Sequence, residues 1–203
     1  IVEIMNEDGT MARRPDLEVF AQKHNLKLGT IAELIKYRMA HDHTIERVAE
    51  NLVKTEFGTF RVLAYQDELD QTIHLALVYG TPDVDKPVLV RVHVRNLLSD
   101  MLTVQHPDFG WPLRNAMKKI TEVGAGIIVM LRHTESPSEL VQRVQSLNLP
   151  RLPQNHKANQ DLRTYGIGAQ ILKDLGVMQM RVLSAPKKMH AISGFGLSVV
   201  EYV

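Results

Sequence analysis

The 203-residue chain contains no cysteine. This absence excludes disulfides, a thiolate nucleophile and every metal site built on sulfur, which leaves histidine and carboxylate side chains as the candidate ligands. An excess of charge of one sign is also missing, because 24 lysines and arginines stand against 23 aspartates and glutamates. A balanced chain lacks the basic field that drives binding to nucleic acids, so we expect no nucleic-acid partner.

Long hydrophobic runs are lacking as well. No apolar stretch approaches the roughly 20 residues that cross a bilayer, and residues 1–8 do not form a signal peptide. Hydrophobic residues nevertheless make up 44% of the sequence, enough for one full domain or two small ones. Because the chain does not begin with methionine, we interpret it as part of a longer, soluble, cytoplasmic protein without a membrane partner.

What is present is an alternation of helical and extended patterns. Predicted helices cover 15–23, about 31–39 (capped by Thr30 with Glu33), 111–123, a short stretch from about 139 that ends by 150, and 167–175. Predicted strands cover 1–4, 26–28, 48–53, 60–65, 73–79, 88–94, 127–131, 180–183 and a last segment after 197. The nearly continuous β-branched run at 88–94 is typical of a central strand that is buried on both faces.

The most informative stretch is 161–177, which reads DLRTYGIGAQILKDLGV. Its isoleucines and leucines fall at helical spacing and predict a buried helix face, and Gly176 supplies the positive φ that ends a helix. Asp161 and Arg163 precede this helix in what we interpret as a polar loop with a glycine turn. The pair is either an exposed ion pair or a carboxylate base beside a guanidinium that binds phosphate.

This stretch resembles the C-terminal signature of GTP cyclohydrolase II, a zinc enzyme of riboflavin synthesis. The resemblance continues upstream, in the same order as in that family, at 57–60, 74–80 and 90–93. It implies an α/β fold in which a mixed β-sheet is flanked by helices. It also implies a proton acceptor at Asp161 and a nucleophile toward the α-phosphate of the substrate at Arg163.

Four further residues stand where the resemblance implies contacts with the substrate, namely Arg91, His93, Arg132 and Lys188. Lys188 lies in a shortened form of a family motif, where it either meets a phosphate or belongs to a solvent-exposed turn. The loop that holds guanine and phosphate in the family is largely changed, since only Arg132 and Leu140 match it. The segment 151–160 is also shorter than in the family, and it lacks a catalytic tyrosine and a threonine that contacts GTP.

The three cysteines that hold zinc in this family are replaced. Asn96, Pro107 and Phe109 stand at their positions. Proline and phenylalanine offer no donor atom, and an amide oxygen suits harder ions than zinc. Zinc in this family activates the water that opens the imidazole ring of GTP, so we expect no metal or other cofactor in this chain and no ring opening.

Two groups of histidine and aspartate offer alternative metal sites. His93, His106 and Asp108 would rebuild the zinc site, although a histidine beside a proline is also typical of an exposed loop. The segment 41–43, His-Asp-His, lies in a linker, where residues two apart on a flexible segment cannot converge on an ion without further ligands. We interpret this linker as a polar hinge.

A second resemblance covers 2–13 and 23–38, which are similar to the final segment of 3,4-dihydroxy-2-butanone 4-phosphate synthase. It implies that Glu3 takes part in catalysis and contacts substrate; without it, Glu3 is a solvated carboxylate at a strand end. The magnesium-binding motifs of that family lie upstream of this chain, so magnesium is expected for the full synthase domain only. The predicted division is a synthase tail at 1–40, a linker at 41–46 and a cyclohydrolase-like domain at 47–203.

Together, the resemblances predict a riboflavin-biosynthesis protein whose cyclohydrolase-like domain is inactive on GTP. We expect this domain to support or regulate the fused synthase, a lyase, by forming a homodimer or by binding a nucleotide or flavin metabolite. The first alternative is an active GTP cyclohydrolase II with a non-cysteine metal site, which converts GTP to 2,5-diamino-6-ribosylamino-pyrimidinone 5′-phosphate, formate and pyrophosphate. The second is an unrelated phosphate-ester enzyme built on Asp161 and Arg163, although no activated nucleophile accompanies them.

Overall fold

The computed structural model describes residues 2–30, 33–34, 37–38, 42, 44–104, 110–132, 136–147, 158–185 and 195–203. For residues 146, 158–163 and 165 it describes the backbone only. The chain divides into two compact units, Ile1–Arg38 and Met39–Val203. Among the described helices, none combines the length and the hydropathy of a membrane span.

The first unit contains helix α1 (Arg14–Lys23), which begins where Pro15 predicts a helix start. A turn at Asn6–Gly9 precedes it, closed by the Gly9 N–H, which donates to the Asn6 carbonyl at 3.0 Å. The predicted strand at 1–4 is wrong for its described residues 2–4, since the one pairing nearby is an isolated bridge between Met5 and Met11.

The predicted strand at 26–28 is also wrong, because these residues complete the end of α1. Asn25 has a φ of 51°, and the Leu26 N–H donates to the Ala21 carbonyl at 2.8 Å. This is the pattern by which a left-handed residue closes a helix. The predicted cap of the next helix is confirmed, since the Glu33 N–H donates to Thr30 Oγ1 at 3.1 Å while Thr30 N–H donates to Glu33 Oε2 at 3.0 Å.

The second unit is built on a seven-stranded sheet with the strand order β1-β2-β3-β5-β4-β6-β7. The pairs from β1 to β5 in this order are antiparallel, and the pairs from β5 to β7 are parallel. The strands are β1 (Ile45–Thr55), β2 (Gly58–Asp67), β3 (Ile73–Tyr79), β4 (Val88–Val94), β5 (Gly126–Leu131), β6 (Gln179–Val182) and β7 (Ser198–Tyr202). The predicted mixed sheet flanked by helices is confirmed.

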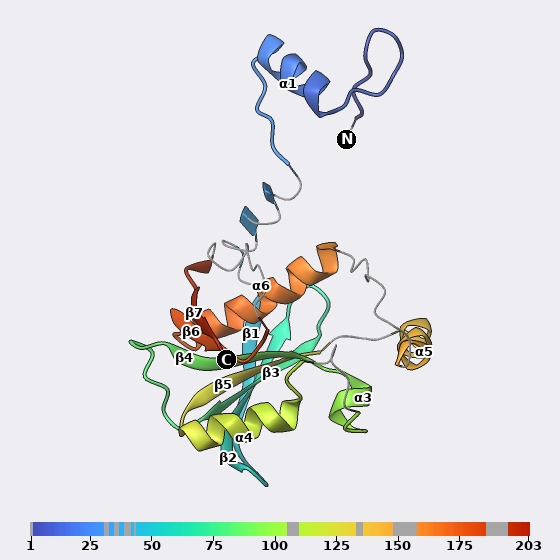
Figure 1. Cartoon of the computed structure of the whole chain (residues 1–203). Coiled ribbons are helices and arrows are strands. Elements are labelled where there is room, and N and C mark those ends of the chain that lie inside the picture. Colours follow the sequence, from blue (N-terminus) through green and yellow to red (C-terminus); the bar gives the residue numbers. More distant parts are fainter. Residues whose placement is uncertain are drawn as a thin grey trace. The chain divides into compact units, whose positions relative to one another are not determined.

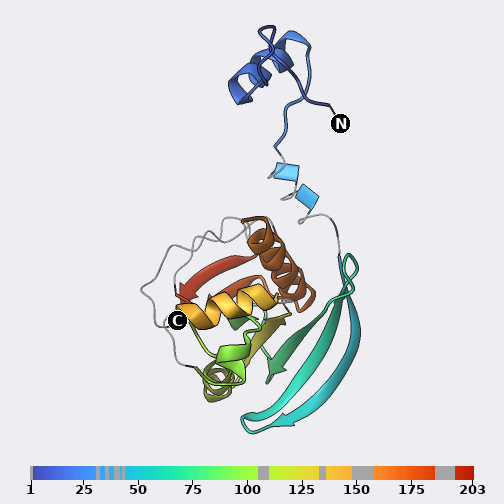
Figure 2. The same cartoon turned by 90° about the vertical axis from the view of Figure 1, so that its right-hand side faces the viewer.

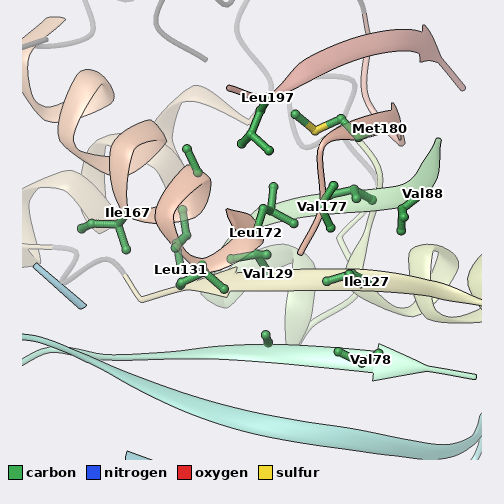
Figure 3. Close-up of a cluster of buried hydrophobic side chains, with 14 of the residues drawn as sticks. Val78, Val88, Ile127, Val129, Leu131, Ile167, Leu172, Val177, Met180 and Leu197 are labelled. Carbon is green, nitrogen blue, oxygen red and sulfur yellow. The ribbon is translucent and has the colours of Figure 1, made fainter. Parts of the chain in front are cut away.

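Helices cover both faces of this sheet (Figure 1). The helices of this unit are α3 (Leu97–Asp100), α4 (Leu113–Val123), α5 (Pro137–Ser146) and α6 (Ala158–Asp174), and those that cover the sheet are α4 and α6. On one face α4 packs Ala116, Met117 and Ile120 against the sheet. On the other face α6 packs its apolar residues against β5, where Figure 3 shows Ile167 beside Leu131.

Helix α6 corrects the prediction of a polar loop and a glycine turn at its start. The helix begins at Ala158, so the backbone of Asp161 and Arg163 is helical rather than part of a loop. Gly168 lies inside this helix and not in a turn, and a Cβ at this position would be at an ordinary contact distance of 3.5 Å from both Leu131 Cδ1 and Val92 Cγ1. The apolar residues of the motif pack against the sheet, a tertiary contact that local sequence does not reveal.

Candidate functional site

The parallel strands β4, β5 and β6 end at one edge of the sheet, and the predicted binding residues gather there. His93 is the next-to-last residue of β4, Arg91 lies at the middle of that strand beside the end of β6, and Arg132 follows β5 directly. Ligands of open α/β sheets bind outside the carboxyl ends of such strands. In Figure 3, Leu172 of helix α6 lies beside Val129, and Ile167 lies beside Leu131, the last residue of β5. The part of α6 that precedes Ile167 therefore extends beyond the same edge.

Arg91 is held by two main-chain carbonyls on the α4 side of the sheet. Its Nη1 donates to the Leu183 carbonyl at 2.8 Å and its Nη2 donates to the Trp111 carbonyl at 2.9 Å. Burial lowers the pKa of Arg91, and the negative charge of Asp100 opposes this effect. The guanidinium thus ties β4 to the segments after β6 and before α4, and its role in binding substrate stays a prediction.

His93 is paired with Asp100, a residue that the sequence analysis did not single out. His93 is 3% exposed, and its Nε2 lies 2.9 Å from both carboxylate oxygens of Asp100. Burial raises the pKa of Asp100, but hydrogen bonds from His93 and the Asn96 amide outweigh burial and lower it overall. The carboxylate also accepts a hydrogen bond from Ser99 Oγ at 3.0 Å.

This histidine has no exposed ring nitrogen with which to exchange a proton. Its Nε2 faces Asp100, and its Nδ1 is buried without a hydrogen-bond partner among the described residues. A general base must lie within hydrogen-bond reach of the proton that it removes. The His93–Asp100 pair therefore connects the end of β4 to α3. Substrate binding by His93 stays a prediction.

Asn96 caps the short helix α3. Its Oδ1 accepts hydrogen bonds from the Leu98 N–H at 3.0 Å and from the Ser99 N–H at 3.4 Å. The Asn96 N–H donates in turn to Asp100 Oδ2 at 2.8 Å. A helix this short has no periodicity to predict it, but an asparagine followed by an acidic residue in the first turn is a recognisable start signal.

The residues at this edge do not fit a zinc ion. Asn96, at the first cysteine position of the resembling family, uses its side-chain oxygen as a helix cap, and the chain contains no thiolate. Within the described residues, no group of three or more histidines, aspartates and glutamates is placed to hold a metal. Of the alternative site, His93 is engaged by Asp100, while His106 and Asp108 lie outside the described residues.

The remaining predicted site residues are placed differently. Arg132 is exposed, and its backbone N–H donates to His74 Nδ1 at 3.1 Å. Glu3 is exposed and belongs to the first unit. The side chains of Asp161 and Arg163 lie outside the described part of the chain, as do Pro107, Phe109 and Lys188. The structure thus brings Arg91, His93 and Arg132 to one edge of the sheet.

Comparison with known proteins gives a match for each unit. A family model described as GTP cyclohydrolase II matches residues 46–203, and one described as 3,4-dihydroxy-2-butanone 4-phosphate synthase matches residues 1–37. Both resemblances predicted from the sequence are thereby confirmed.

Individual relatives extend over both matched regions. A 3,4-dihydroxy-2-butanone 4-phosphate synthase of Pseudomonas aeruginosa is 46% identical over 100% of this chain and 55% of its own length. A riboflavin biosynthesis protein RibBA of Bacillus velezensis is 42% identical over 100% of this chain and 53% of its own length. The crystal structure of RibBX, a two-domain 3,4-dihydroxy-2-butanone 4-phosphate synthase from A. baumannii, matches 98% of this chain and 52% of its own at 36% identity, with a TM-score of 0.69. The chain spans about half the length of the curated relatives that it matches.

Proposed function

Since the chain belongs to the GTP cyclohydrolase II family, we propose that its second unit is a cyclohydrolase-like domain that does not open the ring of GTP. Its role is to support or regulate a 3,4-dihydroxy-2-butanone 4-phosphate synthase of riboflavin biosynthesis to which it is joined. The match of residues 1–37 to the synthase model supports this arrangement.

The observation that carries the proposal is the helix cap at Asn96. In the family, ring opening depends on a zinc-activated water, and this position supplies a thiolate ligand. Here the side-chain oxygen accepts the Leu98 and Ser99 amides at 3.0 and 3.4 Å. A zinc ion would have to replace both hydrogen bonds with one weak amide ligand, and the two α3 amides would lose their acceptor.

The arrangement around His93 supports the same conclusion. His93 Nε2 is not open to a metal in this arrangement, because it lies 2.9 Å from both oxygens of Asp100. The other ring nitrogen is buried without a described partner. Asp100 thus accepts hydrogen bonds from His93 and from the Asn96 N–H, a polar network that stabilises the domain and occupies the side chain of His93.

Formate release from GTP tests the loss of ring opening. We expect the purified chain to release no formate above a protein-free blank, with or without added zinc. An active GTP cyclohydrolase II assayed in parallel controls for the detection limit. Zinc-dependent release of one formate per GTP would overturn the proposal and favour the metal site of His93, His106 and Asp108.

Ligand-induced stabilisation tests the regulatory role. A ligand that binds the native state alone raises the unfolding midpoint, by an amount that follows its concentration relative to Kd. We expect GTP, ribulose 5-phosphate or flavin mononucleotide to raise the midpoint, with sodium phosphate as the control for anions. If none of the three does so, the regulatory role fails and a structural role is left.

Two arginine variants locate the ligand if one binds. Arg132→Gln removes an exposed cation at the end of β5, and we expect it to reduce the shift in midpoint. Arg114→Gln is the matched control, because Arg114 is an exposed arginine on α4 that pairs with Glu56. Equal shifts in both variants would place the ligand away from the sheet edge.

A further inference from the structure

Strand β1 is exposed on both faces and along one edge. It ends the sheet, and among the described strands β2 is its one partner. Every residue from Glu46 to Lys54 is exposed, and Figure 2 shows β1 as the outermost strand of the curved ribbon that it forms with β2 and β3. Such an edge presents backbone N–H and C=O groups to another chain.

The regular part of this edge is the segment 49–55. A bulge between Arg47 and Ala49 shifts the register with β2, and bulges interrupt regular pairing. Within 49–55, alternate side chains share one face of the strand, which places Leu52 between Glu50 and Lys54. Leu52 is 68% exposed, so this face carries an apolar residue flanked by an acid and a base.

This pattern is complementary to itself. When a second copy runs antiparallel with Leu52 opposite Leu52, Glu50 of each copy lies opposite Lys54 of the other. Cross-strand pairs of opposite charge and of apolar residues stabilise a sheet, and a twofold axis makes both ion pairs at once. Registers shifted by one or two residues place Leu52 opposite Asn51, Val53 or a charged side chain, and they lose both ion pairs.

The backbone at Leu52 fits the same register. Its N–H donates to the side-chain Oδ1 of Asn51 at 2.8 Å, as expected for an amide that points away from β2. An outward N–H at Leu52 makes this residue a hydrogen-bonded position for a strand added at the edge. On the twofold axis, the two Leu52 residues exchange both N–H···O=C bonds after the Asn51 side chains turn away.

The charges of the neighbouring strand extend the pattern. Glu50 lies 3.4 Å from Arg61 of β2 and 3.6 Å from Arg47, and its side chain is still partly exposed. Addition of Lys54 from a second copy therefore completes a row of alternating charge across three strands. This row argues for a second copy, because the chain's own sequence supplies Lys54 at this position in the same register as the Leu52 pair.

We propose that two copies of this chain pair antiparallel through residues 49–55 of β1, with Leu52 on the twofold axis. The pairing joins the two seven-stranded sheets into one continuous sheet. It gives the expected homodimer a surface, and it does not depend on the function proposed for the sheet edge. Because seven-residue pairing alone falls below the roughly 1,200 Å² of a typical stable interface, we expect a dimer that dissociates on dilution.

A single introduced cysteine tests the register, since the chain has no other. Hydrogen-bonded antiparallel partners have Cα atoms about 5.5 Å apart, a span that a disulfide bridges. Under mild oxidation we expect Leu52→Cys to form a covalent dimer at least tenfold faster than Leu69→Cys. Leu69 is the matched control, because it is 67% exposed in the turn between β2 and β3. Equal rates for the two variants would overturn the proposal.

A charge reversal tests the pairing without a crosslink. Lys54→Glu places glutamates opposite each other at both ends of the interface, so we expect the dimer fraction in sedimentation to fall at least fivefold. Lys118→Glu reverses an exposed lysine on α4 and should leave the dimer fraction unchanged. A dimer that survives Lys54→Glu, or a chain that is monomeric at all concentrations, would contradict the proposal.

Discussion

Gln170 holds Thr44, the residue at which the chain reaches the sheet. The Thr44 N–H donates to Gln170 Oε1 at 2.9 Å, across 126 positions of sequence. Gln170 is 8% exposed and lies on the buried face of α6, among apolar neighbours. A buried amide needs partners, so this contact both satisfies Gln170 and fixes the start of β1 against the helix that carries Asp161 and Arg163.

Replacing Gln170 with leucine should loosen this contact. The variant keeps the volume of the side chain but removes the acceptor of the Thr44 N–H, and we expect it to lower the free energy of unfolding by about 1–2 kcal/mol. Amide exchange at Thr44 should become faster than in the parent chain. Urea unfolding and hydrogen exchange measure the two effects, with Gln142→Leu on the exposed face of α5 as the control. An unchanged exchange rate at Thr44 would refute the contact.

Tyr65→Phe should weaken the contact between α6 and β2. The Tyr65 hydroxyl donates to Asp174 Oδ2 at 2.6 Å, and Arg47 Nη2 donates to the same oxygen at 2.6 Å. Because Asp174 is partly exposed, we expect a loss of only about 1 kcal/mol in the free energy of unfolding. Tyr79→Phe is the control, since the Tyr79 ring packs against Phe60 and its hydroxyl makes no hydrogen bond among the described residues.

The effect of Tyr65→Phe should depend on pH. Burial acts to raise the pKa of Asp174, but hydrogen bonds from Tyr65 and Arg47 outweigh it and lower the pKa overall. A lowered pKa contributes stability above the ordinary value of about 4, and this contribution is lost as pH falls through the folded value. The difference between parent and variant should therefore shrink between pH 5 and pH 2 or thereabouts. A difference that grows on acidification would exclude this network.

Tyr65 should also make the parent chain lose stability at alkaline pH. Burial, followed by the adjoining Asp174 carboxylate, raises the pKa of Tyr65. For a raised tyrosine pKa, the stabilisation is present below the ordinary value of about 10 and is lost as pH rises above it. The parent chain should lose more stability than Tyr65→Phe above about pH 10, as measured by urea unfolding.

Asp100→Asn should destabilise the domain more than the loss of an exposed ion pair would. The change keeps the shape of the side chain but removes the charge that His93 Nε2 and the Asn96 N–H contact at 2.9 and 2.8 Å. Hydrogen bonds to buried charges contribute about 1.5–3 kcal/mol, and we expect a loss in this range at pH 7. Asp83→Asn, which breaks the exposed pair with Lys86, should cost under about 1 kcal/mol.

Acid should reduce the difference between the parent chain and Asp100→Asn. Although burial alone would raise it, the pKa of Asp100 is lowered overall by His93 and the Asn96 amide. Its stabilisation is therefore present above the ordinary value of about 4 and is lost as pH falls through the folded value. Urea unfolding at several pH values from about 7 to about 3 measures this convergence. Parallel curves for the two chains would mean that the carboxylate is not held as a charged group.

Variants of Asn96 distinguish a helix cap from a metal ligand. Asn96→Ala removes the acceptor of the Leu98 and Ser99 amides and should cost about 1 kcal/mol, whereas Asn96→Ser, also a good cap, should cost about half as much or less. Added zinc should leave the unfolding midpoint of the parent chain unchanged. A zinc-dependent rise that disappears in Asn96→Ala would identify Asn96 as a ligand.

Much of the fold followed from local patterns because its central strands are buried. The predicted bounds of β3 and β4 match the structure, since most of their side chains are apolar and turn residues lie beyond their ends. Strand β1 was predicted too short, at 48–53, because an exposed edge strand carries charges on both faces and shows no alternation.

The candidate site could be predicted only in part. Arg91, His93 and Arg132 were found because the resemblance to a known family marks their positions. Asp100 was missed, since a four-residue helix has no period that sequence reasoning can detect, and its cap depends on Asn96. The start of α6 was predicted wrongly because Gly166 and Gly168 favour a turn locally, whereas in the structure both lie inside the helix.

The sequence by itself determined that no thiolate ligand exists and that strands and helices alternate around apolar cores. It did so because the composition limits the chemistry and the spacing of apolar residues sets the period of each element. Only the tertiary structure decided what each polar group does: His93 lies against Asp100, Arg91 holds two carbonyls, and Asn96 caps a helix. Such roles depend on burial and on contacts between distant segments, which exist only once the sheet has formed.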